Sequence, residues 1–238
     1  MMHKVVCTKK INPSLIAFAA KNNVQIVVAE MIKIDLAAPE LIRPSISSAN
    51  CRVTVFTSKN AVHAVSPFFD LIAEGLFEKI YAMGGATTQA LSRFNKLPVA
   101  TAEDAAALAD VIIKQEEPGS IAFFCGNKHR PELPLKLSSA GFDVQEIEVY
   151  TTTLTPTQVE GIPDGAIFFS PSAAESFFSV NTLDPTGVCF SVGYTTTSAI
   201  ETYTQNKIFT AAYPSEQEMI ELVVSYFKKD SNQDDTKK

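Results

Sequence analysis

The sequence predicts an α/β protein made of two similar lobes, each with a doubly wound parallel sheet. Three observations support this fold class. Short apolar runs alternate with helix-length segments along nearly the whole chain, Ser, Thr and Asn follow several of these runs, and one strand–helix unit occurs twice. Alternation of this kind is typical of parallel sheets with right-handed crossovers, because two parallel strands need a long connection between them.

Nine runs are predicted strands, since they are short, apolar and rich in β-branched and aromatic residues. In chain order they are residues 4–8, 24–29, 52–58, 79–84, 121–126, 143–152, 165–170, 187–193 and 207–212. Between them lie eight predicted helices. These are Pro13–Lys21, Ala61–Ala73, Thr87–Phe94, Asp104–Gln115, Glu132–Ala140, Ala173–Val180, Thr195–Thr204 and Glu216–Phe227. The polar residues 229–238 are expected to be disordered.

The composition is that of a globular protein with a real core. Of 238 residues, 46% are hydrophobic and 19% are charged, and the formal net charge is −6. An acidic chain does not bind nucleic acid through its overall charge, so we expect no nucleic-acid partner. No apolar run reaches the roughly 18 residues of a spanning helix, and the start has no signal-peptide pattern, so we expect no membrane partner either. No exposed apolar stripe calls for a dimer, so we expect a monomer.

The four cysteines are Cys7, Cys51, Cys125 and Cys189. None forms a C-x-x-C pair or stands at metal-ligand spacing from the histidines, so we expect free thiols in a reducing cytoplasm and no metal site. Neither a G-x-G-x-x-G after the first strand nor a phosphate-binding G-x-x-x-x-G-K-[ST] occurs, which argues against a nucleotide cofactor.

One unit of the chain is repeated. Residues 55–62 ("VFTSKNAV") resemble residues 168–177 ("FFSPSAAESF"), and each is followed by a Gly-x-x-Thr turn, "GGATT" or "GYTTT". The repeat implies two similar lobes. Such lobes bind their ligand at the carboxyl ends of the strands, between them.

The strand ends carry groups that suit an anion with several separated charges. Helix N-termini offer free N–H donors, and a neighbouring Lys or Arg adds a charge-assisted bond of about 1.5–3 kcal/mol. Each group also has an ordinary structural explanation, since Ser and Thr cap helices, Gly makes turns, and Lys, Arg and His129 are commonly solvated. The candidate binding residues are Lys9, Thr57, Ser58, Lys59, Asn60, Gly84, Thr87, Gly126, Asn127, Lys128, Arg130, Ser170, Pro171, Ser172, Gly193, Thr195 and Thr196.

Few side chains at these strand ends are acids or bases. No Ser–His–Asp set is evident among three histidines, and paired carboxylates are absent from the predicted strand ends. Tyr150 is the exception, at the end of the predicted strand segment "QEIEVY". It is either an aromatic residue that packs at a strand end or a proton donor that faces the ligand.

Five segments, in order over nearly the whole chain, resemble the uroporphyrinogen-III synthase family. They are "VFTSKNAV", "MGGATTQAL", "FFCGNKHRPELPLKLSSAGFDVQEIEVYTT", "IFFSPSAAESF" and "SVGYTTTSAI". The resemblance implies two flavodoxin-like lobes joined by a two-stranded ladder, with one lobe inserted in the other. The first lobe would then hold residues 1–35 and 155–238, and the inserted lobe residues 36–154.

The resemblance also implies the reaction. The family converts hydroxymethylbilane, a linear tetrapyrrole with eight carboxylates, to uroporphyrinogen III. It removes the terminal hydroxyl as water, inverts the last pyrrole ring through a spiro intermediate and closes the macrocycle, without cofactor or metal. Tyr150 matches the family tyrosine proposed as general acid, and the strand-end Ser and Gly-x-x-Thr residues match its binding groups. Lys9 stands where many members have Arg, and Gly85 where others often have a polar side chain.

Two other classes of protein remain as alternatives. A non-catalytic two-lobed binding or sensor module for small anions would have the same lobes, but Tyr150 would then be replaceable. A regulatory domain derived from the enzyme fold would have lost the strand-end residues, which this chain retains.

Overall fold

The computed structural model describes residues 2–70 and 75–234, with side chains through residue 228. The chain forms two compact units: unit 1 comprises Met1–Lys33 with Thr153–Lys238, and unit 2 comprises Ile34–Thr152. The chain passes from one unit to the other after Lys33 and again after Thr152, each time two residues before the boundary expected from the sequence. Among the described residues, no helix is both long and apolar enough to cross a membrane.

Unit 1 contains a five-stranded sheet in the order β11-β10-β9-β1-β2. All four neighbouring strand pairs of this sheet are parallel. Numbered within the unit, this is the order 2-1-3-4-5 of a flavodoxin-like doubly wound sheet, with the topological switch between β1 and β9. The strands are β1 (His3–Cys7), β2 (Val24–Val28), β9 (Gly165–Phe168), β10 (Val188–Ser191) and β11 (Lys207–Thr210).

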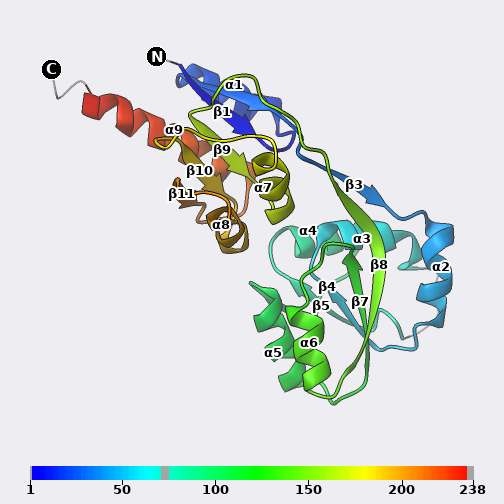
Figure 1. Cartoon of the computed structure of the whole chain (residues 1–238). Helices are drawn as coiled ribbons and strands as arrows, with labels where there is room; N and C mark the ends of the chain where they lie inside the picture. Colours follow the sequence, from blue (N-terminus) through cyan, green and yellow to red (C-terminus); the bar gives the residue numbers. More distant parts are fainter. Residues whose placement is uncertain (1, 71–74, 235–238) are drawn as a thin grey trace. The chain divides into compact units, whose positions relative to one another are not determined.

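Both faces of this sheet are covered, as Figure 1 shows. One face packs against α1 (Pro13–Lys21) and α9 (Glu216–Asp234), and the other against α7 (Pro171–Phe178) and α8 (Tyr194–Glu201). The alternation of side chains along β1 explains the division, because Val5 and Cys7 belong to the first core and Val6 to the second. A strand buried on both faces reads as a continuous apolar run, which is why these strands were recognisable in the sequence.

Unit 2 contains a six-stranded sheet in the order β3-β8-β7-β4-β5-β6. The five strands from β8 to β6 are parallel to one another. Their order within the unit is 3-2-1-4-5, the other common doubly wound arrangement, with its switch between β4 and β7. The strands are β3 (Ile32–Leu36), β4 (Val53–Phe56), β5 (Lys79–Met83), β6 (Ala100–Ala102), β7 (Ser120–Gly126) and β8 (Asp143–Leu154).

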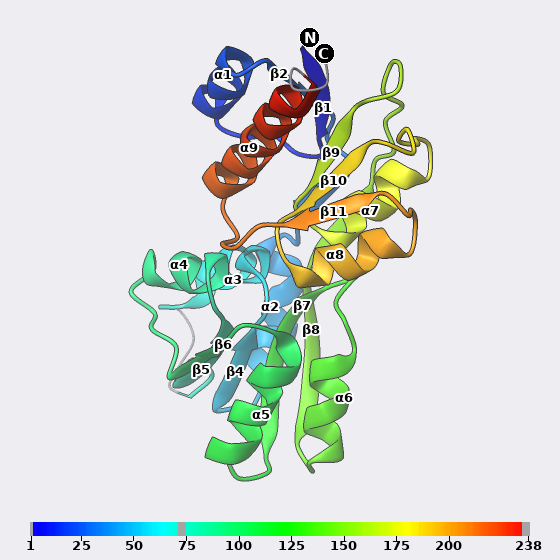
Figure 2. The same cartoon turned by 90° about the vertical axis from the view of Figure 1, so that its left-hand side faces the viewer.

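Helices again cover the two faces, and Figure 2 shows α5 and α6 together on one side of unit 2. That face is covered by α5 (Ala105–Gln115) and α6 (Glu132–Ser139), and the other by α2 (Pro39–Ser48), α3 (Lys59–Val65) and α4 (Ala86–Ser92). The chain enters unit 2 through β3 and leaves it through β8, and these two strands are neighbours in the sheet. The predicted fold class is confirmed, with its two doubly wound parallel sheets, two-stranded ladder and inserted lobe. Only the strand order of unit 2 differs from the flavodoxin-like order expected of both lobes.

Several element predictions were wrong in detail. The helix expected over Ala61–Ala73 ends at Val65, followed by a short 3₁₀ turn, Ser66–Phe68, because Pro67 has no N–H to continue the helix; residues 71–74 lie outside the described residues. The last helix continues to Asp234, so residues 229–234 are helical where disorder was expected, and residues 235–238 lie outside the described residues. No Gly or Pro interrupts residues 216–234, so the packed part of α9 propagates into a polar end.

The strand β3 was expected only as part of the ladder that the family resemblance implied, and two further elements were not predicted at all. The strand β6 has only three residues, none of them buried, so it leaves no apolar run in the sequence. Helix α2 contains Pro44, which ordinarily interrupts a helix. It forms because Pro39 occupies its first turn and because Ile42 and Ile46, one turn apart, are both buried in the core.

An ionic hydrogen-bond cluster ties the end of α5 to β5. The Lys79 ammonium lies 3.0 and 2.8 Å from the two Glu116 carboxylate oxygens, and the Tyr81 hydroxyl donates to Glu116 at 2.6 Å. Burial disfavours the charged carboxylate, but the hydrogen bonds from Lys79 and Tyr81 outweigh that cost and hold the pKa of Glu116 below its usual value. Burial and the neighbouring Glu116 raise the pKa of Tyr81, which therefore stays protonated and remains a donor.

We predict that Glu116→Gln lowers the free energy of unfolding by about 1–3 kcal/mol at pH 7, the cost of losing charged hydrogen bonds in a partly buried place. Because the folded-state pKa of Glu116 is depressed, its contribution is present above the unfolded pKa, about 4.3, and is lost as the pH falls through the folded value. Urea unfolding of both proteins at pH 7 and at successively lower pH measures the difference. Glu117→Gln, an equal charge change at an exposed neighbour, is the control; if it costs as much, the cluster is not the cause.

Candidate functional site

The candidate binding residues gather around the topological switch of each sheet. In unit 2, Ser58 follows β4 and the segment 126–130 follows β7, and these two strands are neighbours. In unit 1, Lys9 follows β1 and Ser170 follows β9, which are also neighbours. At a switch point the two crossovers leave in opposite directions, so the strand ends there remain open to a ligand. The two Gly-x-x-Thr turns follow β5 and β10, one strand further along each sheet.

Ser58 makes two hydrogen bonds at the start of α3. Its hydroxyl oxygen accepts from the Asn60 N–H at 3.1 Å, so Ser58 is the N-cap of the helix. Ser58 also hydrogen-bonds the Tyr150 side chain. Because the oxygen of Ser58 already accepts from Asn60, its own proton is available to donate to the Tyr150 oxygen. The hydroxyl thus caps a helix and supports the phenol at the same time.

Tyr150 is half-buried near the end of β8, packed beside the core under α2, α3 and α4. Burial raises the pKa of its phenol, and the Ser58 hydrogen bond opposes that rise in part. The phenol therefore carries its proton at neutral pH, and a partner that can stabilise the phenolate is already in contact with it. A protonated phenol with a donor at its oxygen can act as a general acid.

A β-bulge directs Tyr150 to this place. Up to Cys125 the partners in β7 and β8 advance together, with Cys125 opposite Glu148, but Gly126 is opposite Tyr150, so one residue of β8 is inserted. Without the bulge, strict alternation would place Tyr150 on the same face as Glu146 and Glu148. A Cβ on Gly126 would lie 2.4 Å from the Tyr150 ring, so this position accepts only glycine while the ring stays where it is.

The loop after β7 is fastened to β8 at two points. The Thr152 N–H donates to the Asn127 side-chain oxygen at 2.8 Å, and the Asn127 amide reaches the Thr152 carbonyl at 3.4 Å. The His129 Nδ1 lies 2.9 Å from the Gly126 carbonyl oxygen. Asn127, expected to bind substrate, thus has a structural role that sequence reasoning missed. Lys128 and Arg130 are exposed on the same loop, with Arg130 3.8 Å from Glu132.

The Gly-x-x-Thr turns differ from what the sequence suggested. Thr87 is 5% exposed and Thr196 is 3% exposed, so both hydroxyls are withdrawn from solvent. The residue at the N-cap of α4 is Gly85, with φ of 66°, and that of α8 is Gly193. Neither N-cap has a side chain to cap its helix. In both turns the backbone N–H groups are therefore the more accessible donors.

In unit 1, Lys9 is engaged within the protein. Its ammonium lies 2.7 Å from a Glu216 carboxylate oxygen and 4.3 Å from the centre of the Phe169 ring. Ser170 caps α7 by accepting from the Ala173 N–H at 3.2 Å, as Ser58 caps α3. Pro171 and Ser172 form the first turn of that helix and are partly exposed.

Three hydroxyls that the sequence did not single out meet beside the second turn. The Thr197 hydroxyl lies 2.6 Å from that of Ser191 and 2.7 Å from that of Thr210, so α8, β10 and β11 are joined at the carboxyl end of the sheet. Thr195, the remaining candidate of this turn, is exposed. The separations of these hydroxyls in the sequence carry no recognisable pattern, so only the fold identifies the group.

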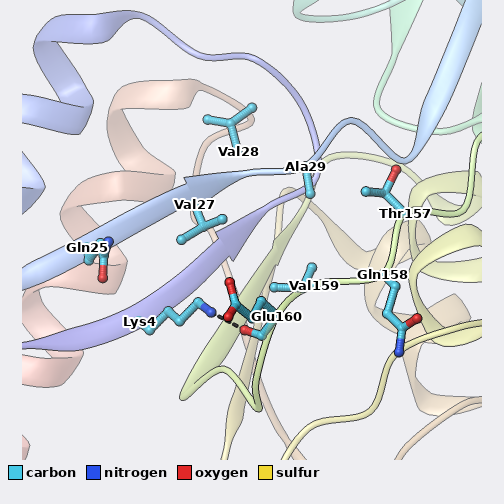
Figure 3. Close-up of a pocket in the computed structure, with 9 residues that line it drawn as sticks. All are labelled: Lys4, Gln25, Val27, Val28, Ala29, Thr157, Gln158, Val159 and Glu160. Atoms are coloured by element: carbon cyan, nitrogen blue, oxygen red, sulfur yellow. Dashed lines mark hydrogen bonds between the residues drawn. The ribbon is translucent and has the colours of Figure 1, made fainter.

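A separate cavity in unit 1, of about 420 Å³, contains none of the candidate residues. It is lined by β1, β2 and the segment Thr157–Glu160, and the Lys4 ammonium there donates to the Glu160 carbonyl (Figure 3). The remaining candidates of unit 2, Thr57, Lys59 and Gly84, lie at the ends of β4 and β5. The candidate site is therefore formed by strand ends and helix starts, and this cavity is not part of it.

Known proteins resemble the chain in family and in fold. The model of the uroporphyrinogen-III synthase HemD family (HEM4) matches residues 14–221. A mutant uroporphyrinogen III synthase of Thermus thermophilus superposes with a TM-score of 0.74 at 16% identity, covering 97% of this chain and 99% of that one. The Helicobacter pylori uroporphyrinogen-III synthetase superposes with a TM-score of 0.65 at 19% identity, covering 94% and 100%. No curated protein sequence matches significantly.

The family match spans most of the chain and agrees with the order of elements and the two parallel sheets. The solved structures, all below 20% identity here, independently support the fold. The chain belongs to the uroporphyrinogen-III synthase family.

Proposed function

We propose that this chain is a lyase that converts hydroxymethylbilane to uroporphyrinogen III, with loss of water and inversion of the terminal pyrrole ring. The observation that carries the proposal, beyond family membership, is the pair formed by Tyr150 and Ser58 at the switch point of unit 2. A protonated phenol with a hydrogen-bond donor at its oxygen is suited to release one proton to a departing hydroxyl.

In the proposed first step, the bond between the terminal methylene carbon and its hydroxyl oxygen breaks, and the electron pair leaves with the oxygen. The Tyr150 proton passes to that oxygen, and water departs. The Ser58 hydroxyl then donates to the phenolate that remains, which partly offsets the cost of a negative charge in a half-buried place. Ring inversion and closure need mainly that the two ends of the substrate be held in one geometry.

The substrate's carboxylates are bound, in this proposal, by the cations and N–H groups at the strand ends. In unit 2, the cations would be Lys59, Lys128 and Arg130. The turns that hold the N–H donors would be formed by Thr57, Asn60, Gly84, Thr87, Gly126 and Asn127. In unit 1, the turns that hold the N–H donors would be formed by Ser170, Pro171, Ser172, Gly193, Thr195 and Thr196. Lys9 would bind a carboxylate only by exchanging its partner Glu216.

We further propose that the protein acts as a monomer in the cytoplasm. All four cysteines are buried free thiols, as expected in a reducing compartment.

The proposal is tested by giving the purified protein freshly made hydroxymethylbilane and identifying the isomer after oxidation. We expect the type III isomer in large excess. Spontaneous closure forms the uninverted type I isomer. If only that isomer forms, at the rate without protein, the chain is instead a binding or sensor module for another anion.

We predict that Tyr150→Phe lowers kcat about 100-fold, the lower part of the range for loss of a general acid. The phenylalanine ring still fits over Gly126, so the melting temperature should stay close to that of the wild type. Tyr203→Phe, which removes a hydroxyl from a half-exposed ring stacked on Phe178, is the matched control. Unchanged turnover in Tyr150→Phe would remove this residue from the mechanism.

We predict that replacing both Lys128 and Arg130 with Ala raises KM at least about tenfold with a smaller effect on kcat. Charged hydrogen bonds to carboxylates contribute about 1.5–3 kcal/mol each, and exposure reduces that value. Steady-state kinetics measures the two constants. The control replaces both Arg93 and Lys114 with Ala. These two cations are exposed in the same unit but lie away from the strand ends, so the same charge is removed from a different place. A loss confined to kcat, or an equal effect in this control, contradicts the binding role.

A further inference from the structure

Three side chains of different chemistry meet on the face of unit 2 that α5 and α6 cover. They are Cys125 on β7, His129 on the following loop and Glu146 on β8, and one possible ligand atom of each lies within 4.8 Å of the others. Cys125 is 3% exposed, whereas the side chains of His129 and Glu146 are 26% and 43% exposed. The cluster thus has a buried sulfur and an open side.

The sheet register brings these residues together. Phe123 is opposite Glu146 and Cys125 is opposite Glu148, so all four side chains lie on one face of the two strands. The His129 ring lies edge-on to the Phe123 ring, with centroids 5.5 Å apart. The loop therefore folds back over the strand that precedes it, and the imidazole contacts the Glu146 carboxylate.

The orientation of the His129 ring is the second observation. Its Nδ1 lies 2.9 Å from the Gly126 carbonyl oxygen, which can only accept, so Nδ1 carries a hydrogen. Its Nε2 lies 2.5 Å from a Glu146 carboxylate oxygen. A lone pair on Nε2 would face another acceptor there, so a positive charge must be shared between the two atoms. It is either a proton or a metal ion. Metal-binding histidines usually donate the N–H of their other ring nitrogen to a carboxylate, a backbone carbonyl or water, as Nδ1 of His129 does to Gly126.

We propose that Cys125, His129 and Glu146 form a binding site for a divalent cation of the Zn²⁺ type. Sulfur, imidazole nitrogen and carboxylate oxygen are the three donors that Zn²⁺ uses in proteins, and water would complete the tetrahedron. On binding, the sulfur–metal bond replaces the S–H bond, and the metal ion takes the place of the proton shared by His129 and Glu146. Both protons pass to the buffer. Burial, then Glu146 and Glu148, raise the pKa of Cys125 to about 12, and the same two negative charges attract a cation.

The present distances need a small adjustment to suit the ion. With metal–ligand bonds of about 2.0–2.2 Å, the nitrogen and oxygen of a tetrahedral site are about 3.3 Å apart. The Nε2 and Oε2 atoms, now 2.5 Å apart, must separate by less than 1 Å. The partly exposed Glu146 can rotate to allow this, whereas the buried Cys125 and the carbonyl-bound ring of His129 keep their places.

A cation in this site would connect the loop after β7 to β8 through His129 and Glu146. It would reinforce the existing Asn127–Thr152 hydrogen bonds, which already fasten the same loop. The proposal concerns cation binding alone and is independent of the proposed reaction.

The test is titration of the metal-free full-length protein with Zn²⁺ by calorimetry and with Co²⁺ by absorption. We expect one site and a thiolate-to-Co²⁺ charge-transfer band in the near ultraviolet. Cys125→Ser should abolish that band, and His129→Gln and Glu146→Gln should each weaken Zn²⁺ binding at least about tenfold, since even second-shell losses have effects of that size. Cys51→Ser, another buried thiol of unit 2, is the control.

If Cys125→Ser fails to fold, the variants of His129 and Glu146 still test the site. His129→Gln and Glu146→Gln change partly exposed side chains, and circular dichroism checks that both variants fold. No Zn²⁺ binding by the wild type, binding without a charge-transfer band, or affinity unchanged in both of these variants would each overturn the site. The shared charge between His129 and Glu146 would then be a proton.

Discussion

The arrangement of the molecule depends on one constraint, the reversal of crossover direction within each parallel sheet. Right-handed crossovers place consecutive helices on one face until the chain starts again from the middle of the sheet and covers the other face. The reversal falls between β1 and β9 in one unit and between β4 and β7 in the other. It leaves the carboxyl ends of those central strands uncovered, and the candidate residues follow the strands that end there.

At the reversal in unit 2, a close approach to the backbone of Gly126 decides the position of the candidate acid, Tyr150. The Tyr150 ring occupies the space that a side chain at residue 126 would fill, and the bulge in β8 turns it away from the face of Glu146 and Glu148. Ser58 meets its oxygen there and caps α3 with the same hydroxyl. The cap and the candidate acid are therefore not independent. Replacing Ser58 would affect the helix start and the phenol together.

The loop after β7 combines two kinds of charge. Exposed Lys128 and Arg130 offer positive charge to an anion, whereas Glu146 and Glu148 surround the Cys125 thiol on the α6 side of the sheet. His129 lies between these groups and contacts the second set. An acidic chain can thus present local cations for a polycarboxylate and, by the further inference, local carboxylates for a metal ion, a few residues apart.

The amino-acid sequence alone determined the fold class, the order of the strands along the chain, and the segments where polar groups follow them, because buried parallel strands and capped helix starts leave strong local patterns. The scarcity of acids and bases at the predicted strand ends singled out Tyr150, and the family resemblance matched it to a proposed general acid. Tertiary structure decided the rest. Register between strands decides the bulge, the absence of space above Gly126, and the meeting of Cys125, His129 and Glu146. The packing of helices on the sheets decides the burial of Thr87 and Thr196 and the pairing of Lys9 with Glu216. Both bring together residues that are distant in sequence, so no local pattern records them.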